Sequence, residues 1–189
     1  MRDFSDWRAS IVVICLAITL VGGIDQATRD ALKVKDLLGT IEKQHPSRSN
    51  TKDQTAEITE KELNAYIAYR LSREKSSPVN SLKVDLLDND NIQGKIRLDG
   101  QQLNLGALFG EDLDFDFKGA VHTRNGAARI ELTALQLNGR PVEPGMLDMV
   151  LAAAALYSGE EIGRVGDWYK MPKGIKQVRV QKGRAILHY

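Results

Sequence analysis

The chain has 189 residues, of which 42% are apolar and 27% charged, and its formal net charge is +1. This length and composition predict one globular domain with short appendages and exclude a mainly disordered chain. The near-zero net charge argues against a nucleic-acid-binding protein that relies on bulk positive charge. The single cysteine, Cys15, excludes an intramolecular disulfide, so cysteine content does not report the redox compartment.

The first predicted element is the uncharged apolar stretch Ser10–Ile24. It is shorter than the about 20 residues that a spanning helix needs, and its length is typical of a signal-peptide core. Its small-residue cleavage pattern is poor, because Gly22 and Gly23 form the only candidate site. We therefore favour an uncleaved signal anchor over residues 1–24, with a cleaved signal peptide or a buried helix of a soluble protein as the alternatives. The anchor predicts a single-pass protein of the inner (cytoplasmic) membrane, with its N-terminus inside and its C-terminal domain extracytoplasmic.

Residues 25–45 are expected to form a juxtamembrane helix. Its apolar residues recur at alternating spacings of three and four, which is a heptad pattern. This stripe consists of Ile24, Ala27, Ala31, Val34, Leu38 and Ile41. Two interpretations stay open: the stripe packs on the chain's own domain, or residues 24–41 form a short parallel homodimer stalk. Pro46 ends the helix, and residues 46–57 are predicted to be a flexible linker.

A folded domain is predicted over residues 58–189, and it begins with a strong helix-start signal. Thr59 is expected to be the N-cap residue, and Glu62 three positions later completes a capping box. Apolar residues at helical spacing continue as far as Leu71, and the helix is expected to end before Pro78.

The apolar period then changes to two, which predicts antiparallel strands. The alternating segments cover residues 82–86, 92–98, 113–121 and 128–132, and Asn125–Gly126 is a hairpin signal. Leu135 and Leu137 fall on the opposite parity from the preceding strand residues. This flip predicts a β-bulge or a sharp bend. A last hairpin is predicted over residues 175–189.

The stretch Pro144–Tyr157 predicts a helix that is apolar on almost every side, because Asp148 is its only charged residue. A surface helix would show a broad polar back, so the chain's own sheet, a partner chain or a lipid must cover this one. The expected fold class is α+β. A long helix and this second, apolar helix would pack on a highly curved antiparallel sheet of about six strands, preceded by the N-terminal membrane helix.

Three segments carry a resemblance to a known family: Ile58–Tyr66, Leu137–Val142 and Met171–Ile175. Together they resemble the bacterial, membrane-tethered branch of the tubular lipid-binding (TULIP-like) superfamily, over roughly Ile58–Tyr189. Met171 departs from the leucine that this family usually has before its late proline. The resemblance implies a helix wrapped by a highly curved sheet, with an apolar groove for acyl chains.

Candidate groove residues are apolar side chains on the predicted strands and on the apolar helix, where Val150 lies at the centre of the expected deep face. The set is Phe115, Phe117, Leu132, Met146, Met149, Val150, Ala153 and Tyr157. Trp168, Tyr169 and Lys170 are candidates for a membrane interface, where amphipathic rings and a snorkelling lysine are found together.

The sequence contains no catalytic or metal-binding pattern. The acidic run from Glu111 to Asp116 lacks the glycine and glutamate that a calcium loop requires, and the three histidines lie on separate predicted elements. Neither a nucleophile motif nor a phosphate-binding loop is present. We therefore expect no enzyme activity, no cofactor and no metal.

These features predict a membrane-anchored extracytoplasmic lipid-binding module that holds or transfers lipid in the cell envelope. Its expected partner is membrane lipid, and nucleic acid is not expected to bind. The alternative is a non-enzymatic structural or assembly protein of an envelope complex, in which the apolar helix is a protein–protein interface.

Overall fold

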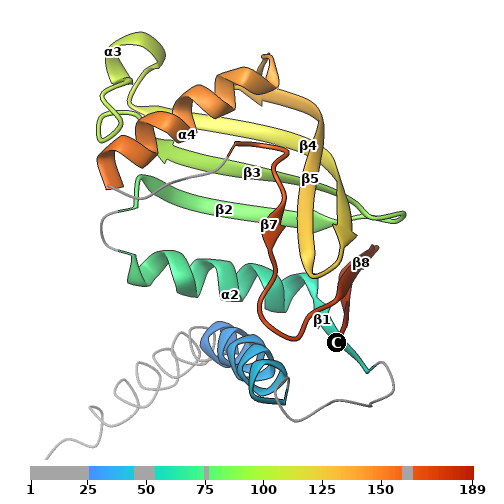
Figure 1. The fold of residues 1–189 in the computed structure, drawn as a ribbon. Helices are drawn as coiled ribbons and strands as arrows, with labels where there is room; N and C mark the ends of the chain where they lie inside the picture. The colour runs from blue at the N-terminus through green and yellow to red at the C-terminus, as the bar shows by residue number, and fades with distance from the viewer. Residues whose placement is uncertain (1–25, 45–53, 75–76, 159–163) are drawn as a thin grey trace, which may run out of the picture.

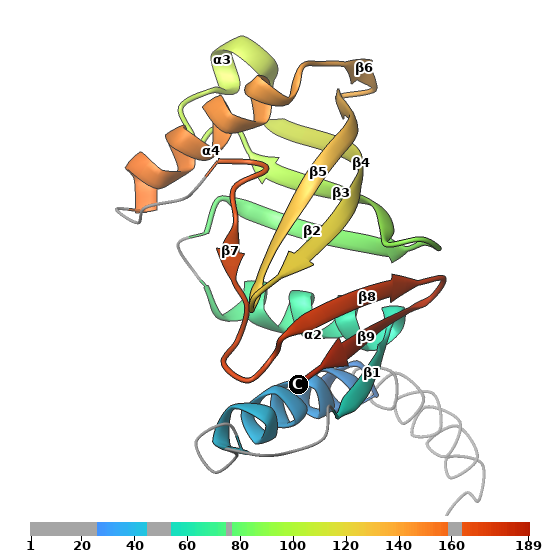
Figure 2. The ribbon, with the colours of Figure 1, turned by 45° about the vertical axis from the view of Figure 1, so that its right-hand side comes forward.

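The structure is a computed structural model that describes residues 26–44, 54–74, 77–158 and 164–189. It confirms the α+β class and the strong curl of the antiparallel sheet (Figures 1 and 2). The anchor predicted over residues 1–24 lies outside the described residues. Within those that are described, no helix combines the length and apolarity needed to cross a membrane.

A helix over residues 26–44 precedes the labelled elements. The elements are β1 Thr55–Thr59, α2 Glu60–Arg73, β2 Val79–Leu86, β3 Asn91–Asp99, α3 Gly106–Phe109, β4 Asp112–Arg124, β5 Ala127–Leu137, β6 Arg140–Pro141, α4 Pro144–Ser158, β7 Tyr169–Lys170, β8 Gln177–Gln181 and β9 Arg184–His188. The predicted order of a helix, four long antiparallel strands, an apolar helix and a final hairpin is confirmed.

The larger sheet has the order β2-β3-β4-β5-β6, and β7 pairs with β5. Lys118 in β4 pairs with Ala134 in β5, but the next residue, Gly119, pairs with Leu132. Thr133 is therefore the extra residue of a β-bulge, as the parity flip predicted. A bulge bends its strand and increases the local twist, so this one contributes to the curl of the sheet.

A smaller sheet, β1-β9-β8, lies beside the larger one. Its strand β1 differs from the sequence expectation, which placed residues 55–57 in the linker. Thr55 pairs with His188, and Thr59 pairs with Arg184. The segment carries a single large apolar side chain, Ile58, so its strand character comes from pairing with β9 and left little trace in the apolar pattern.

The capping box that starts α2 is confirmed. Glu62 donates its backbone N–H to the Thr59 hydroxyl, and the Glu62 carboxylate accepts from the Thr59 backbone N–H at 2.9 Å. The helix then runs along β2 (Figure 1). Its Asn64 amide accepts a hydrogen bond from Val84 N–H at 2.8 Å and donates one to Val84 C=O at 2.7 Å. The Glu60 carboxylate accepts from Leu86 N–H at 2.8 Å.

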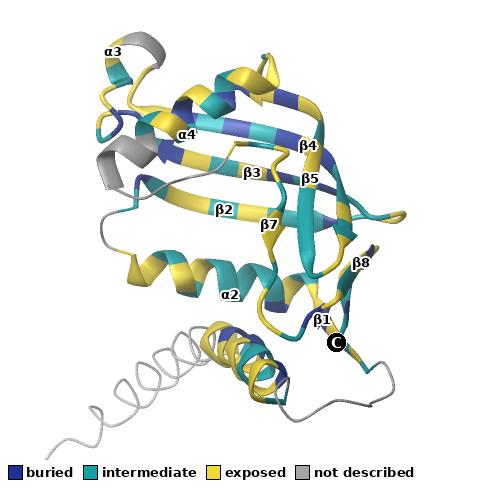
Figure 3. Cartoon of the chain, in the orientation of Figure 1, coloured by how far each residue is buried: buried dark blue, intermediate teal, exposed yellow. Residues whose placement is uncertain are grey.

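The main core lies inside the curl of the larger sheet. Along β3 and β4, buried residues alternate with less buried ones (Figure 3). Phe115 and Leu113 of β4 and Val150 of α4 are each at most 1% exposed. The apolar side chains of the predicted alternating pattern therefore face the core, as expected. Helix α4 packs over one end of the sheet (Figure 2).

The apolar stripe of the N-terminal helix packs on the chain's own domain. Ala31, Val34 and Ile41 are at most 2% exposed. Val34 and Ile41 belong to a second core cluster with Ile58, Ile175 and Leu187. Of the two interpretations left open, packing within one chain is the one the structure contains. A homodimer through residues 24–41 stays a prediction, and it would need a face other than these buried side chains.

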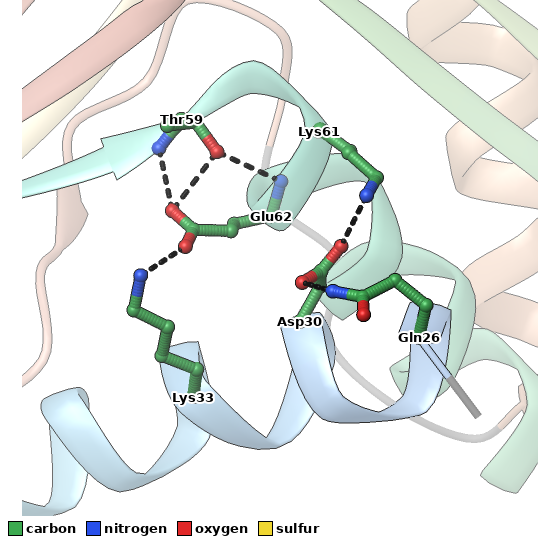
Figure 4. Close-up of polar contacts among 6 residues, drawn as sticks. All are labelled: Gln26, Asp30, Lys33, Thr59, Lys61 and Glu62. Atoms are coloured by element: carbon green, nitrogen blue, oxygen red, sulfur yellow. Dashed lines mark hydrogen bonds and ion pairs between the residues drawn. The ribbon is translucent and has the colours of Figure 1, made fainter.

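Ion pairs reinforce this contact between the N-terminal helix and α2 (Figure 4). Lys33 donates to the Glu62 carboxylate, and Lys61 Nζ lies 2.9 Å from Asp30 Oδ2. Burial raises the pKa of the Glu62 carboxyl, but hydrogen bonds from Lys33 and Thr59 outweigh burial and hold the pKa below its ordinary value. The ionised carboxylate therefore both caps α2 and binds the N-terminal helix.

Acid is expected to weaken this junction. Because the folded protein lowers the pKa of Glu62, the resulting stabilisation is complete above the ordinary carboxyl pKa of about 4.3 and is lost as the pH falls through the folded value. Glu62→Gln should therefore flatten the fall in unfolding free energy below about pH 4.5, measured by urea unfolding at stepped pH. Glu42→Gln, at an exposed position of the N-terminal helix, is the control. Parallel profiles for wild type and Glu62→Gln would contradict this role.

Candidate apolar ligand pocket

A pocket of about 380 Å³ opens inside the curl of the larger sheet, between its strands, α4 and the chain segment Arg164–Lys170 that contains β7. We call this the β7 segment. The pocket is lined by Leu82, Val84, Ile92, Ile96, Phe117, Ala128, Arg129, Ile130, Leu132, Leu147, Leu151, Val165, Gly166 and Tyr169. Its volume falls in the range of about 300–1,000 Å³ that is usual for small-molecule sites.

The strand residues reach the pocket because side chains alternate between the two faces of a sheet. Ile92 and Ile96 in β3 therefore share the inner face with Gly94, which lies between them. Gly94 pairs directly with Phe117. A Cβ atom at Gly94 would lie 2.6 Å from Phe117 Cζ and 2.4 Å from the Lys83 carbonyl oxygen. Glycine at this position therefore makes room for the Phe117 ring that lines the pocket.

Helix α4 lines the pocket with Leu147 and Leu151, which are one turn apart. Neither residue was among the candidate groove residues predicted from the sequence, so the structure adds both to the candidate set. Helical periodicity is uninformative here, because α4 is apolar around most of its circumference and no polar back marks its outer side.

The single charge of α4 has a structural use that the sequence did not reveal. Asp148 Oδ1 accepts a hydrogen bond from Val165 N–H at 2.7 Å, which ties the β7 segment to α4. Tyr169 donates its hydroxyl to Arg164 C=O at 2.8 Å within the same segment. Burial, followed by the nearby Asp167 and Asp148 carboxylates, raises the pKa of the Tyr169 phenol. Tyr169 is therefore a neutral hydrogen-bond donor at the pocket.

The predicted groove residues whose side chains the structure describes divide into three groups. Phe117 and Leu132 line the pocket. Phe115 and Val150 are instead buried in the core cluster, and Met146 and Ala153 pack against that cluster. Met149 is 45% exposed. Tyr157 belongs to α4, but its side chain is outside what the structure describes.

The membrane-interface candidates do not form one aromatic surface. Trp168 is half-buried, with the guanidinium of Arg124 4.1 Å and that of Arg129 5.2 Å from the ring centre. Tyr169 is 48% exposed and lines the pocket, and Lys170 is exposed. Trp168 directly precedes β7 and Tyr169 is its first residue, and successive side chains of an extended segment turn to opposite faces. Contact of these residues with a membrane stays a prediction.

The lining residues that were not among the predicted groove residues come from β2, β3, β5, α4 and the β7 segment. The sequence analysis placed four of them, Leu82, Val84, Ile92 and Ile96, on the apolar side of predicted strands. It did not identify them as pocket residues. Alternation identifies an inner face but not which part of that face is left without a packing partner. That depends on how the curl brings β2 opposite β5.

The outer face of the same sheet is charged. Lys95 Nζ lies 2.9 Å from Asp116 Oδ1, and Arg97 Nε lies 2.7 Å from Asp114 Oδ1. The Arg97 hydrogen bond lowers the pKa of the Asp114 carboxyl. These carboxylates are thus paired with cross-strand cations. Across the described ranges, no three histidine, cysteine, aspartate or glutamate residues form a group suited to a metal ion.

Comparison of the chain with family models, curated proteins and solved structures finds no match.

Proposed function

We propose that this chain is a non-enzymatic lipid-binding module that holds a hydrocarbon chain in the apolar pocket. A single observation carries the proposal: a pocket of about 380 Å³ is surrounded almost entirely by aliphatic and aromatic side chains. The resemblance to membrane-tethered tubular lipid-binding proteins, carried by the three sequence segments, points to the same function.

The chemistry of the lining favours hydrocarbon over a polar ligand. A bound water or polar group needs several hydrogen-bonding partners, and a polar group buried without them loses free energy. Most lining residues come from strand faces and α4 and present only carbon atoms. An acyl chain would remove apolar surface from water on both sides, which contributes about 25 cal/mol per Å² of buried area.

The proposed setting is the outer side of the cytoplasmic membrane. Residues 1–24 would act as the anchor, and the helix over residues 26–44 packs directly on the domain. A short connection between the anchor and a docked helix would keep the pocket close to the bilayer. Such proximity suits a module that holds or transfers membrane lipid.

Leu151→Glu is expected to abolish lipid binding, because it adds a charge to the pocket wall. Native mass spectrometry of the purified full chain should find a phospholipid or similar diacyl lipid retained by the wild type. The variant should retain at least about tenfold less, which corresponds to about 1.4 kcal/mol. Met149→Glu is the matched control, since it adds the same charge to an exposed position of the same helix.

The same pair of variants separates lipid binding from the alternative, a structural or assembly protein that uses α4 as a protein–protein interface. Met149 is 45% exposed on α4 and would belong to such an interface. In that case Met149→Glu should release a protein partner, and the wild type should carry no lipid. The proposed function would be overturned if the wild type retained no lipid and the Leu151→Glu variant did not differ from it.

A further inference from the structure

One charged residue contributes to the rim of the pocket. Among the described residues that line it, Arg129 alone is charged. The neighbouring Ile130 also lines the pocket and is 39% exposed, so this part of β5 lies where the pocket meets solvent. Because successive strand side chains face opposite sides, Ile130 turns inward and Arg129 turns toward the outer side of the rim.

Within the ranges that the structure describes, the Arg129 guanidinium has few hydrogen-bonding partners. Its Nη2 lies 3.4 Å from Glu131 Oε2, and the same oxygen lies 3.0 Å from His122 Nε2. Its Nε is buried and has no hydrogen-bond partner within the described part of the chain. A guanidinium carries five N–H donors, so a single shared carboxylate oxygen leaves most of this capacity unused.

A second arginine adds positive charge at the same place. Arg124 and Arg129 both lie against Trp168, at 4.1 Å and 5.2 Å from its ring centre. Contact with the face of an indole orients a guanidinium while leaving its N–H groups available at the edge. The pairing of Ala127 with Lys170 brings another exposed cation beside these arginines.

From this arrangement we infer that the pocket takes an amphipathic ligand with an anionic end, a carboxylate or a phosphate, which binds at the Arg129 guanidinium on the outer side of the rim while the hydrocarbon chain crosses the rim into the pocket. This inference rests on the proposed function. Planar guanidinium groups bind both anions through paired, charge-assisted hydrogen bonds, and these are stronger than bonds between neutral groups. The class of ligand is therefore an anionic lipid or a fatty acid.

The test compares three ligands with the same chain length: dodecanoate, dodecyl phosphate and dodecanol. Binding to the full chain, held in a non-ionic amphipol, is measured at pH 8 by displacement of the neutral dye Nile red. The wild type should bind both anions at least about tenfold more tightly than the alcohol. Arg129→Gln should reduce the anions to the affinity of dodecanol and leave dodecanol unchanged, whereas Arg129→Lys should keep part of the preference.

Arg140→Gln is the matched control, because it removes the same charge from an exposed position in β6; it should keep the wild-type preference. Equal wild-type affinity for the three ligands would overturn the inference and leave the hydrocarbon pocket intact. Failure of all three ligands to bind would overturn the proposed function itself. Inorganic phosphate or acetate that binds as tightly as its dodecyl counterpart would show recognition of a free anion, which also overturns the inference. If Arg129→Gln does not fold, the wild-type affinities for the two anions and for dodecanol still test whether the pocket prefers an anionic ligand.

Discussion

Val150→Glu is expected to destabilise the domain strongly. Val150 is fully buried in α4 and belongs to the main core cluster, and it is absent from the described lining of the pocket. A glutamate there has no route to water and no cation beside it within that cluster. Burial of an unpaired carboxyl group should remove on the order of 4 kcal/mol of the unfolding free energy, a large part of the about 5–15 kcal/mol typical of a domain.

The expected loss is measured by urea unfolding followed by circular dichroism, with Met149→Glu as the control. Met149 is the adjacent residue and is 45% exposed, so the same substitution should change the unfolding free energy by less than about 0.5 kcal/mol. A Val150→Glu protein as stable as the wild type would mean that α4 is not docked on the core through this residue.

Gly94→Ala is expected to destabilise the sheet and distort the pocket together. The new methyl group would lie 2.4 Å from the Lys83 carbonyl oxygen, which belongs to a paired strand and cannot move away easily. It would also meet the Phe117 ring at 2.6 Å. Overpacking of this kind should cost about 3 kcal/mol of unfolding free energy.

Gly145→Ala provides the control, because no other group lies within 4 Å of a Cβ atom placed there. It adds the same methyl group near the start of α4 and should be neutral or slightly stabilising. Thermal unfolding of both variants gives the stability, and Nile red binding reports the pocket. A Gly94→Ala protein with wild-type stability would mean that β2 and β3 separate more readily than their register implies.

Features that depend on neighbouring residues could be predicted from the sequence. The capping box of Thr59 and Glu62 needs only the residues within one helical turn, and it was identified from their spacing. The parity flip at Leu135 revealed the bulge, since alternation along one strand records which face is buried. The strands and the final hairpin followed from the same local pattern.

Features that depend on distant partners could not be predicted in this way. Strand β1 forms because its backbone pairs with β9, at the far end of the chain. The stripe of the N-terminal helix has the same spacing whether it meets another copy or its own domain. The role proposed for Arg129 depends on Trp168, which lies beside β5 because β7 pairs with that strand. The residue spacing within β5 gives no sign of this contact. Leu151 lines the pocket only because of the rotation of an almost wholly apolar helix.

The hydrogen bonds from α2 to β2 also affect how the molecule behaves among its copies. An uncovered edge strand is a template to which another chain can add a strand, and this is a common route to aggregation. The Asn64 side chain hydrogen-bonds both the N–H and the C=O of Val84, so these groups are not available to another strand. Glu60 accepts a hydrogen bond from the N–H of Leu86, two residues further along the same edge of β2. Solubility of this curled sheet therefore depends on α2 staying docked, as well as on the charge of its surface.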